Sequence, residues 1–138
     1  MPYELVVGPP ALDDYLRLRR DSGLTPVTPE QGAGAIANSW SFCHIQSTVD
    51  DATVAMGRVL GDGGWYFCVA DMATLPEHQR NGLGRRVLDW LIADIHSRAP
   101  ENPYVTLFAD APGRALYSAA GFVESAPESL GMNLPYIG

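Results

Sequence analysis

The segment 71–86 constrains the fold most, because it joins a strand-like run to a long amphipathic helix. Residues 65–74 are apolar on both alternating faces and only Asp71 interrupts them, a pattern that predicts a central strand. One expected face of this strand consists of Trp65, Phe67, Val69 and Ala73. Apolar residues then recur at helical spacing over residues 82–99, and Pro100 ends the helix. We expect the rest of the chain to be arranged around this junction.

The link between the strand and the helix, residues 79–84, carries no bulky apolar side chain except Leu83. Its glycines, Gly82 and Gly84, allow a tight turn and the close approach of a ligand. A helix N-terminus offers unpaired amides and the positive end of the helix dipole, and nearby arginines add positive charge. The junction therefore predicts a phosphate-binding site.

Two familiar phosphate-binding loops do not fit the sequence. A Walker A loop requires a lysine, and the chain contains none; a dinucleotide fingerprint requires a third glycine at position 87, which is Val87. The pattern Gln/Arg-x-x-Gly-x-Gly/Ala does fit, at Gln79, Gly82 and Gly84, and the turn Leu75-Pro-Glu precedes it. This segment resembles the acyl-CoA signature of the GNAT superfamily of N-acyltransferases, in which successive loop amides hold the coenzyme A pyrophosphate.

A second segment, Arg114-Ala-Leu-Tyr-Ser-Ala-Ala-Gly-Phe122, resembles the Leu-Tyr-x-x-x-Gly-Phe segment of the same superfamily, and its tyrosine is Tyr117. GNAT proteins often carry asparagine seven residues before that tyrosine, where this chain has Asp110. The resemblance covers residues 52–123 and implies that acetyl-CoA is the cofactor.

The resemblance also implies roles for individual residues. Acetyl-CoA would be held by the strand end, the loop and the position seven before the tyrosine: Met72, Ala73, Thr74, Gln79, Arg80, Asn81, Gly82, Leu83, Gly84, Arg85 and Asp110. A backbone amide near Met72 would hold the oxyanion that develops during attack on the thioester. The acceptor pocket would include Leu24, Trp40 and Phe42, although residues of these types more often belong to a core.

By the same resemblance, Tyr117 would be the general acid that protonates the departing thiolate. The conjugate acid of a thiolate has a pKa of roughly 8.5 and phenol one of about 10, so proton transfer between them is easy. A lone tyrosine on a helix usually belongs to the core, but Gly121-Phe122 at the family spacing favours the catalytic role.

The base that accepts the proton of the amine has more than one candidate. Asp71 is one, because a carboxylate in an apolar strand should have a raised pKa. The alternatives are a structural Asp71 that fixes the strand end through hydrogen bonds, and a water molecule that relays the proton. All of these interpretations stay open at the level of the sequence.

The order of the expected elements gives the fold class. Strands are expected over residues 3–7, 41–49, 52–60, 65–74 and 104–108, from Phe122, and over 131–137; helices are expected over 12–21, 28–38, 82–99 and 113–120. The helical crossover makes strand 104–108 parallel to the central strand. We predict an α/β (α+β) fold of the GNAT type, in which helices flank a mixed, mostly antiparallel sheet with a splayed parallel strand pair.

Composition excludes several classes of protein. The chain of 138 residues is expected to form one domain, and its net charge of −7 disfavours nucleic acid and favours a cationic ligand. We expect neither a membrane segment nor a signal peptide, because no apolar run approaches ~20 residues. The two cysteines, Cys43 and Cys68, lack metal or redox spacing, so we expect no metal site and a reducing compartment. A monomer and a homodimer are both compatible with the sequence.

We predict a cytoplasmic, acetyl-CoA-dependent N-acetyltransferase whose acceptor is a small-molecule primary amine. Direct transfer within a ternary complex is expected, because no cysteine lies near the proposed thioester site. Two alternatives remain, an acyl-CoA-binding sensor without turnover and an enzyme with a different phosphate ligand. Tyr117 disfavours the first, and the failed comparisons with the Walker A and dinucleotide loops disfavour the second.

Overall fold

The computed structural model describes residues 2–135 of the chain. Contacts divide the chain into two compact units, Met1–Leu107 and Phe108–Gly138. The first unit contains the whole sheet and helices α1 to α3, and the second contains helix α4. The single-domain interpretation of the sequence stays a prediction. None of the helices within residues 2–135 combines the length and the apolar character that crossing a bilayer requires.

The first unit is built on one mixed sheet in the order β1-β2-β3-β4-β5. Its strands are β1 (Tyr3–Val7), β2 (Ser41–Ser47), β3 (Thr53–Gly61), β4 (Tyr66–Thr74) and β5 (Tyr104–Leu107). The first four pair antiparallel to their neighbours, and β5 pairs parallel to β4. The predicted meander, and the parallel strand added by a helical crossover, are both confirmed.

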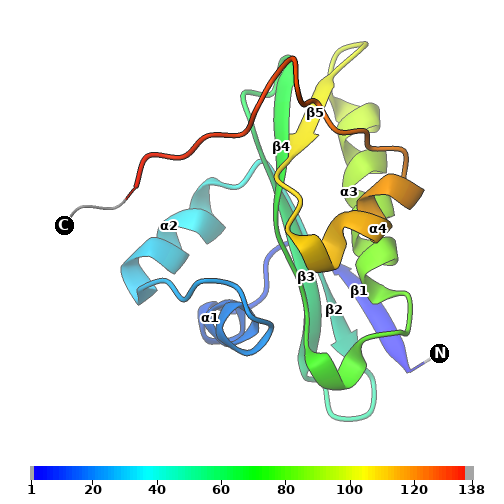
Figure 1. The fold of residues 1–138 in the computed structure, drawn as a ribbon. Helices are drawn as coiled ribbons and strands as arrows, with labels where there is room; N and C mark the ends of the chain where they lie inside the picture. Colours follow the sequence, from blue (N-terminus) through cyan, green and yellow to red (C-terminus); the bar gives the residue numbers. More distant parts are fainter. Residues whose placement is uncertain (1, 136–138) are drawn as a thin grey trace. The chain divides into compact units, whose positions relative to one another are not determined.

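Helices cover both faces of this sheet. Helices α1 (Leu12–Asp21) and α2 (Pro29–Asn38) lie on one face, and α3 (Leu83–Arg98) lies on the other (Figure 1). Helix α2 opens with the predicted capping box, in which Thr28 and Gln31 each accept a hydrogen bond from the other's backbone amide. Helix α3 packs its apolar stripe on the sheet, and the stripe is fully or almost fully buried: Leu83, Val87, Leu88, Leu91 and Ile95.

Strand β4 contains a β-bulge that the alternation of its sequence did not predict. Ala70 pairs with Arg58 and Ala73 pairs with Met56, so Asp71 and Met72 together oppose the single residue Gly57. The backbone of Asp71 has φ +54°, in the left-handed region. The bulge therefore shifts the phase of the strand by one residue.

The phase shift changes which side chains share a face. Val69 pairs with Val59, whereas Ala73 pairs with Met56, and Val59 and Met56 point to opposite faces because they lie three residues apart in β3. The expectation that Ala73 shares a face with Phe67 and Val69 was therefore wrong. Asp71 turns instead toward the face that α1 and α2 cover, where its hydrogen-bond partners lie.

In the second unit, helix α4 (Arg114–Ala119) forms as expected, after a short 3₁₀ turn at Ala111–Gly113. The strands expected from Phe122 and over 131–137 do not form within the described residues, and positions 136–137 lie outside them. The amide of Phe122 donates to the carbonyl of Tyr117 at 3.0 Å. This amide is thus used by the end of a helix, so a strand ladder cannot begin with the amide of Phe122.

Candidate active site

The loop between β4 and α3 presents a row of backbone amides that have no partners in the described part of the chain. A 3₁₀ turn (Pro76–His78) leads into the loop, where Arg80 and Gly82 have φ +66° and +72°. Among the described residues, no hydrogen-bond acceptor meets any backbone amide from Arg80 to Arg85; the first helical bond runs from Arg86 to the carbonyl of Gly82, at 3.1 Å. Consecutive amides in such a loop, at a helix N-terminus, form a concave site for an anion.

Side chains of the loop hold its shape. The Asn81 amide group donates to the carbonyls of His78 and Gln79 at 3.0 and 3.2 Å, and the Gln79 side chain donates to the carbonyl of Thr74 at 3.3 Å. Leu83 is 2% exposed and anchors the loop in the core. Arg85 forms an ion pair with Asp89 one helical turn later. The side chains of Gln79, Asn81 and Leu83 therefore support the loop, and its row of backbone amides is left without acceptors among the described residues.

Strands β4 and β5 stop pairing before the end of β4. Their parallel register runs from Tyr66↔Tyr104 to Val69↔Leu107, whereas β4 continues to Thr74. Within the first unit, the last residues of β4 thus have a strand partner only on the β3 side. This edge offers backbone groups to an extended ligand, and it belongs to the predicted cofactor residues Met72, Ala73 and Thr74.

The side chain of Met72 is partly buried and packs against the core. A Cβ atom added to Gly57 would lie 2.5 Å from Met72 Sδ and 2.7 Å from Val87 Cγ1, so the Met72 side chain covers Gly57 on the α3 side of the sheet. The sulfur of Met72 thus packs on the sheet, and the backbone of Met72 is left for the predicted contacts with a ligand. Glycine at position 57 is what allows Met72 to pack there.

Asp71 lies in a cluster with side chains of α1 and β3. Its carboxylate accepts hydrogen bonds from the Tyr15 hydroxyl (2.5 Å), Arg19 Nη1 (2.5 Å) and Arg58 Nε (2.7 Å), and its side chain is 8% exposed. Burial and the neighbouring Asp71 carboxylate raise the pKa of Tyr15. The surroundings of Asp71 are therefore charged and hydrogen-bonding, not apolar. These contacts support the structural interpretation, and the base role of Asp71 stays a prediction.

The sequence offered only partial signals for this cluster. Tyr15 and Arg19 are four residues apart and so share a face of α1, and Arg58 is a charged residue within an otherwise apolar strand. Neither signal shows that both elements meet Asp71, because α1, β3 and β4 lie far apart along the chain.

Two of the predicted acceptor residues, Trp40 and Phe42, lie together, and the shared acceptor pocket with Leu24 stays a prediction. Trp40 and Phe42 line a cleft of about 310 Å³ together with residues of α3 such as Asp94, and Leu24 is not among its lining residues. The Trp40 ring packs on Phe67 at 4.8 Å and lies under the Arg98 guanidinium at 3.8 Å. Because Arg98 ends α3, this cleft lies at the opposite end of that helix from the loop.

Tyr117 occupies a helix end whose geometry explains its motif. The amides of Gly121 and Phe122 donate to the carbonyls of Ser118 and Tyr117, both at 3.0 Å, and Gly121 has φ +103°. The rings of Tyr117 and Phe122 meet edge to face at 6.2 Å. This is a Schellman cap with its hydrophobic contact, so the spacing Tyr-x-x-x-Gly-Phe has a structural cause.

The environment of Tyr117 within the second unit keeps its phenol protonated. Burial, followed by the negative charge of Asp110, raises the pKa of Tyr117 above its ordinary value near 10. Asp110 is itself exposed and precedes the 3₁₀ turn. A phenol of this kind is fully protonated at neutral pH, which is the form that a general acid requires.

Comparison with known proteins identifies the family. The model of the acetyltransferase (GNAT) domain matches residues 41–124. The chain belongs to the GNAT acetyltransferase family. This match contains both segments that carried the resemblance, the loop at 79–84 and the segment ending at Phe122.

Solved structures of similar proteins have the same fold. A probable acetyltransferase from methicillin-resistant Staphylococcus aureus is 31% identical, with a TM-score of 0.90 over 97% of this chain and 99% of that one. A Clostridium acetobutylicum protein whose structure was solved with acetyl-CoA has a TM-score of 0.72 at 18% identity, covering 95% of this chain and 96% of its own, and shows the shared fold.

A curated relative is serotonin N-acetyltransferase 2, chloroplastic, from Oryza sativa subsp. japonica. It is 33% identical over 79 residues, which are 57% of this chain and 38% of that protein. The chain thus matches well under half of the length of this relative.

Proposed function

We propose that this GNAT protein is an acetyl-CoA-dependent N-acetyltransferase that acetylates a small-molecule primary amine by direct attack within a ternary complex. The observation that carries the proposal is the row of amides from Arg80 to Arg85, at the N-terminus of α3, which have no acceptor within residues 2–135. A pyrophosphate offers several anionic oxygens to such a row, and the unpaired edge of β4 next to it suits the extended pantetheine arm.

The proposed acetyl transfer needs only a few groups of the protein. The thioester supplies an activated acetyl carbon; the amine nitrogen bonds to it, the carbon–sulfur bond breaks, and the sulfur leaves with the electron pair. In this proposal a backbone amide of the β4 bulge near Met72 holds the oxygen that gains charge, and Tyr117 gives its proton to the sulfur. The proton of the amine passes to water or to Asp71. Water is the simpler acceptor, because both Asp71 oxygens already accept hydrogen bonds from protein groups.

Direct transfer is preferred over an acyl-cysteine route. Cys43 is buried under α3, and burial raises the pKa of its thiol to about 12, which leaves almost no thiolate at neutral pH. Cys68 is three residues before the bulge, or about 10 Å along an extended strand. Both cysteines are free thiols, which supports the cytoplasmic location that we include in the proposal.

Calorimetry with acetyl-CoA tests the binding half of the proposal. Gly84→Val adds a branched side chain at the second residue of α3, and we expect it to abolish binding. Gly34→Val is the matched control, because a Cβ atom at this α2 position would meet nothing within 4 Å. Equal affinity of the wild type and Gly84→Val would contradict the loop as the pyrophosphate site.

A thiol-release assay tests the catalytic half. With acetyl-CoA and a panel of primary amines, we expect thiol release that depends on the amine and yields the N-acetyl product by mass spectrometry. Acetyl-CoA binding without release by any amine would support the alternative, a non-catalytic acyl-CoA sensor.

A further inference from the structure

The cluster around Asp71 contains more positive than negative charge. Arg19 and Arg58 both form ion pairs with the one carboxylate of Asp71, and each arginine side chain is only 13% exposed. Among the described residues, neither arginine forms an ion pair with any other acidic group. One guanidinium charge is thus left without a counterion in a mostly desolvated place, which is unfavourable unless an anion completes it.

The two arginines use their donors differently. Arg19 Nη1 binds Asp71, and its Nε and Nη2 both bind the carbonyl of Thr25, at 2.9 and 2.6 Å. Arg58 binds Asp71 through Nε and donates to the Ser39 hydroxyl through Nη1 at 3.3 Å. Its Nη2 atom has no acceptor among the described residues. Arg58 is therefore the member of the cluster that can bind another group.

This remaining donor is not fully buried. Within residues 2–135, the Ser22 hydroxyl oxygen is the only fully buried side-chain polar atom that lacks a hydrogen bond. Arg58 Nη2 therefore keeps some contact with solvent although most of its side chain is covered. A small anion could approach this atom without unfolding the cluster.

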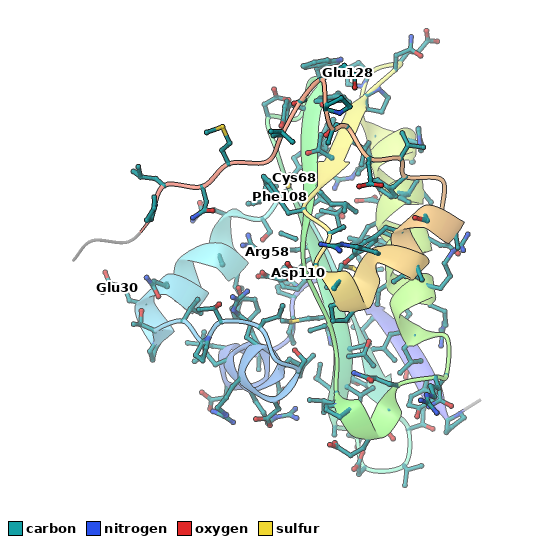
Figure 2. The ribbon with its side chains drawn as sticks, in the orientation of Figure 1. Glu30, Arg58, Cys68, Phe108, Asp110 and Glu128 are labelled. Carbon is teal, nitrogen blue, oxygen red and sulfur yellow. The ribbon has the colours of Figure 1, made fainter. Side chains whose placement is uncertain are left out.

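Arg58 also lies beside the bulge. Its partner across the strands is Ala70, the residue before Asp71, and its side chain lies on the face of the sheet that α1 and α2 cover (Figure 2). In the proposed function this bulge holds the thioester oxygen. An acceptor whose amine attacks at the bulge would bring its other functional groups close to Arg58.

We propose that Arg58 binds a carboxylate of the acceptor, so that the acceptor is an amino acid or a similar amine that carries a carboxylate. This inference rests on the proposed acetyltransferase function. A guanidinium binds a planar carboxylate through parallel hydrogen bonds, and Nη1 can join Nη2 by releasing its long bond to Ser39.

The charge of the whole protein agrees with such an acceptor. The net charge of −7 attracts the ammonium form of the amine at a distance, although salt screens this attraction beyond about 8 Å. At contact the unneutralised guanidinium selects the carboxylate. An amine that also carries a carboxylate is attracted by the net negative charge and can bind the guanidinium. A simple cationic amine is attracted but has no group that binds the guanidinium.

The test compares an amino acid with its methyl ester, in the wild type and in two variants. Arg58→Gln should lower kcat/KM for the amino acid by about 10- to 100-fold more than for the ester, the usual effect of losing charge-assisted hydrogen bonds. Arg19→Gln is the matched control, because it removes the same charge from the same carboxylate, and it should affect both acceptors equally. The ratio between variants cancels the different reactivities of the two amines.

A second measurement uses only the wild type and does not depend on the folding of a variant. The carboxylic acid that lacks the amino group should compete with the amino acid acceptor, whereas the matching primary amide should not. Equal losses for both acceptors in Arg58→Gln, or no competition by the acid, would overturn the carboxylate site while amine acetylation stands. Absence of thiol release with every amine would instead overturn the proposed function and this inference with it.

Discussion

The two ends of the segment 71–86 differ in how their polar groups are satisfied. At the strand end, the buried carboxylate of Asp71 accepts hydrogen bonds from Tyr15, Arg19 and Arg58. At the helix end, every backbone amide from Arg80 to Arg85 lacks an acceptor within the described residues. The carboxylate of Asp71 is thus satisfied by protein groups alone, whereas the amides at the helix end have hydrogen-bonding capacity that only water or a ligand can use.

In the proposed function the Asp71 cluster therefore serves to stabilise the fold around the site, whereas the Arg80–Arg85 amides serve to bind a ligand. The Asp71 cluster joins α1, β3 and β4, and so fixes a bulge whose backbone lies in the left-handed region. Changes at this end should lower the stability of the fold. Changes at the helix end should leave the fold intact and alter acetyl-CoA binding.

Asp71→Asn should produce the largest loss of stability. Asparagine tolerates a positive φ, so the substitution preserves the bulge and removes only the negative charge that pairs with the two arginines. We expect the free energy of unfolding to fall by about 3 kcal/mol, because buried guanidinium groups are left unpaired. Urea denaturation of the wild type and of Asp71→Asn measures this difference in the free energy of unfolding.

The control is Asp89→Asn, which breaks an exposed ion pair with Arg85 on α3. That change should stay within about 0.5 kcal/mol. Similar losses in the two variants would mean that the Asp71 cluster is no more important to stability than a surface pair.

Tyr117→Phe should have the next largest effect, and on catalysis only. The substitution keeps the ring that packs on Phe122 and the carbonyl that caps the helix, and it removes the proton donor. We expect kcat to fall about 100-fold, while acetyl-CoA affinity measured by calorimetry stays unchanged. Because the pKa of Tyr117 is raised, wild-type kcat should not decline through loss of this proton below about pH 10. If Tyr117→Phe turns over as fast as the wild type under conditions where the chemical step limits the rate, Tyr117 serves only to cap helix α4.

Gly57→Ala should have a smaller effect and should act at the strand end. The added methyl group would overlap Met72 Sδ and Val87 Cγ1, so the residue opposite the bulge has no room for it. We expect a loss of about 1–3 kcal/mol in the free energy of unfolding. Gly64→Ala is the control, since its nearest contact, with Asp62 Oδ1, is an ordinary 3.6 Å. If both variants unfold at the same denaturant concentration, the packing of Met72 over Gly57 is not tight.

The smallest expected effect is the dependence of stability on pH through the buried thiol of Cys43. Folding raises the pKa of Cys43 from 9.0 to about 12, so its contribution to stability is complete below pH 9 and is lost as the pH rises toward 12. At pH 8 a thiol reagent should therefore modify the partly buried Cys68 and reach Cys43 only after denaturation. Rapid modification of both thiols in the native protein would contradict the burial of Cys43.

Local signals in the sequence predicted most of the fold and the loop. The alternation of apolar residues, the capping box at Thr28 and the glycines of the loop act over a few residues each, so the order of elements and the start of α3 could be predicted. The resemblance to GNAT proteins, which the family match confirms, supplied the ligand expected at that loop.

The sequence could not predict features that depend on register or on distant contacts. The bulge at Asp71 requires knowing that Gly57 lies opposite, and the placement of Trp40 under Arg98 requires the packing of α3. The alternation of Leu130, Met132 and Leu134 is typical of a strand, but a strand also needs a neighbouring backbone, and these side chains are 68%, 86% and 95% exposed. Apolar pattern alone therefore overestimated the number of strands.

Amide NMR of the labelled protein during titration with acetyl-CoA tests the central claim most directly. We predict that the resonances of the Arg80–Arg85 amides shift and that their exchange with solvent slows, because these amides acquire pyrophosphate oxygens as acceptors. The amides of β1, at the far edge of the sheet, should not change. Saturation with acetyl-CoA that leaves the Arg80–Arg85 amides unaltered would contradict the assignment of this loop as the pyrophosphate site.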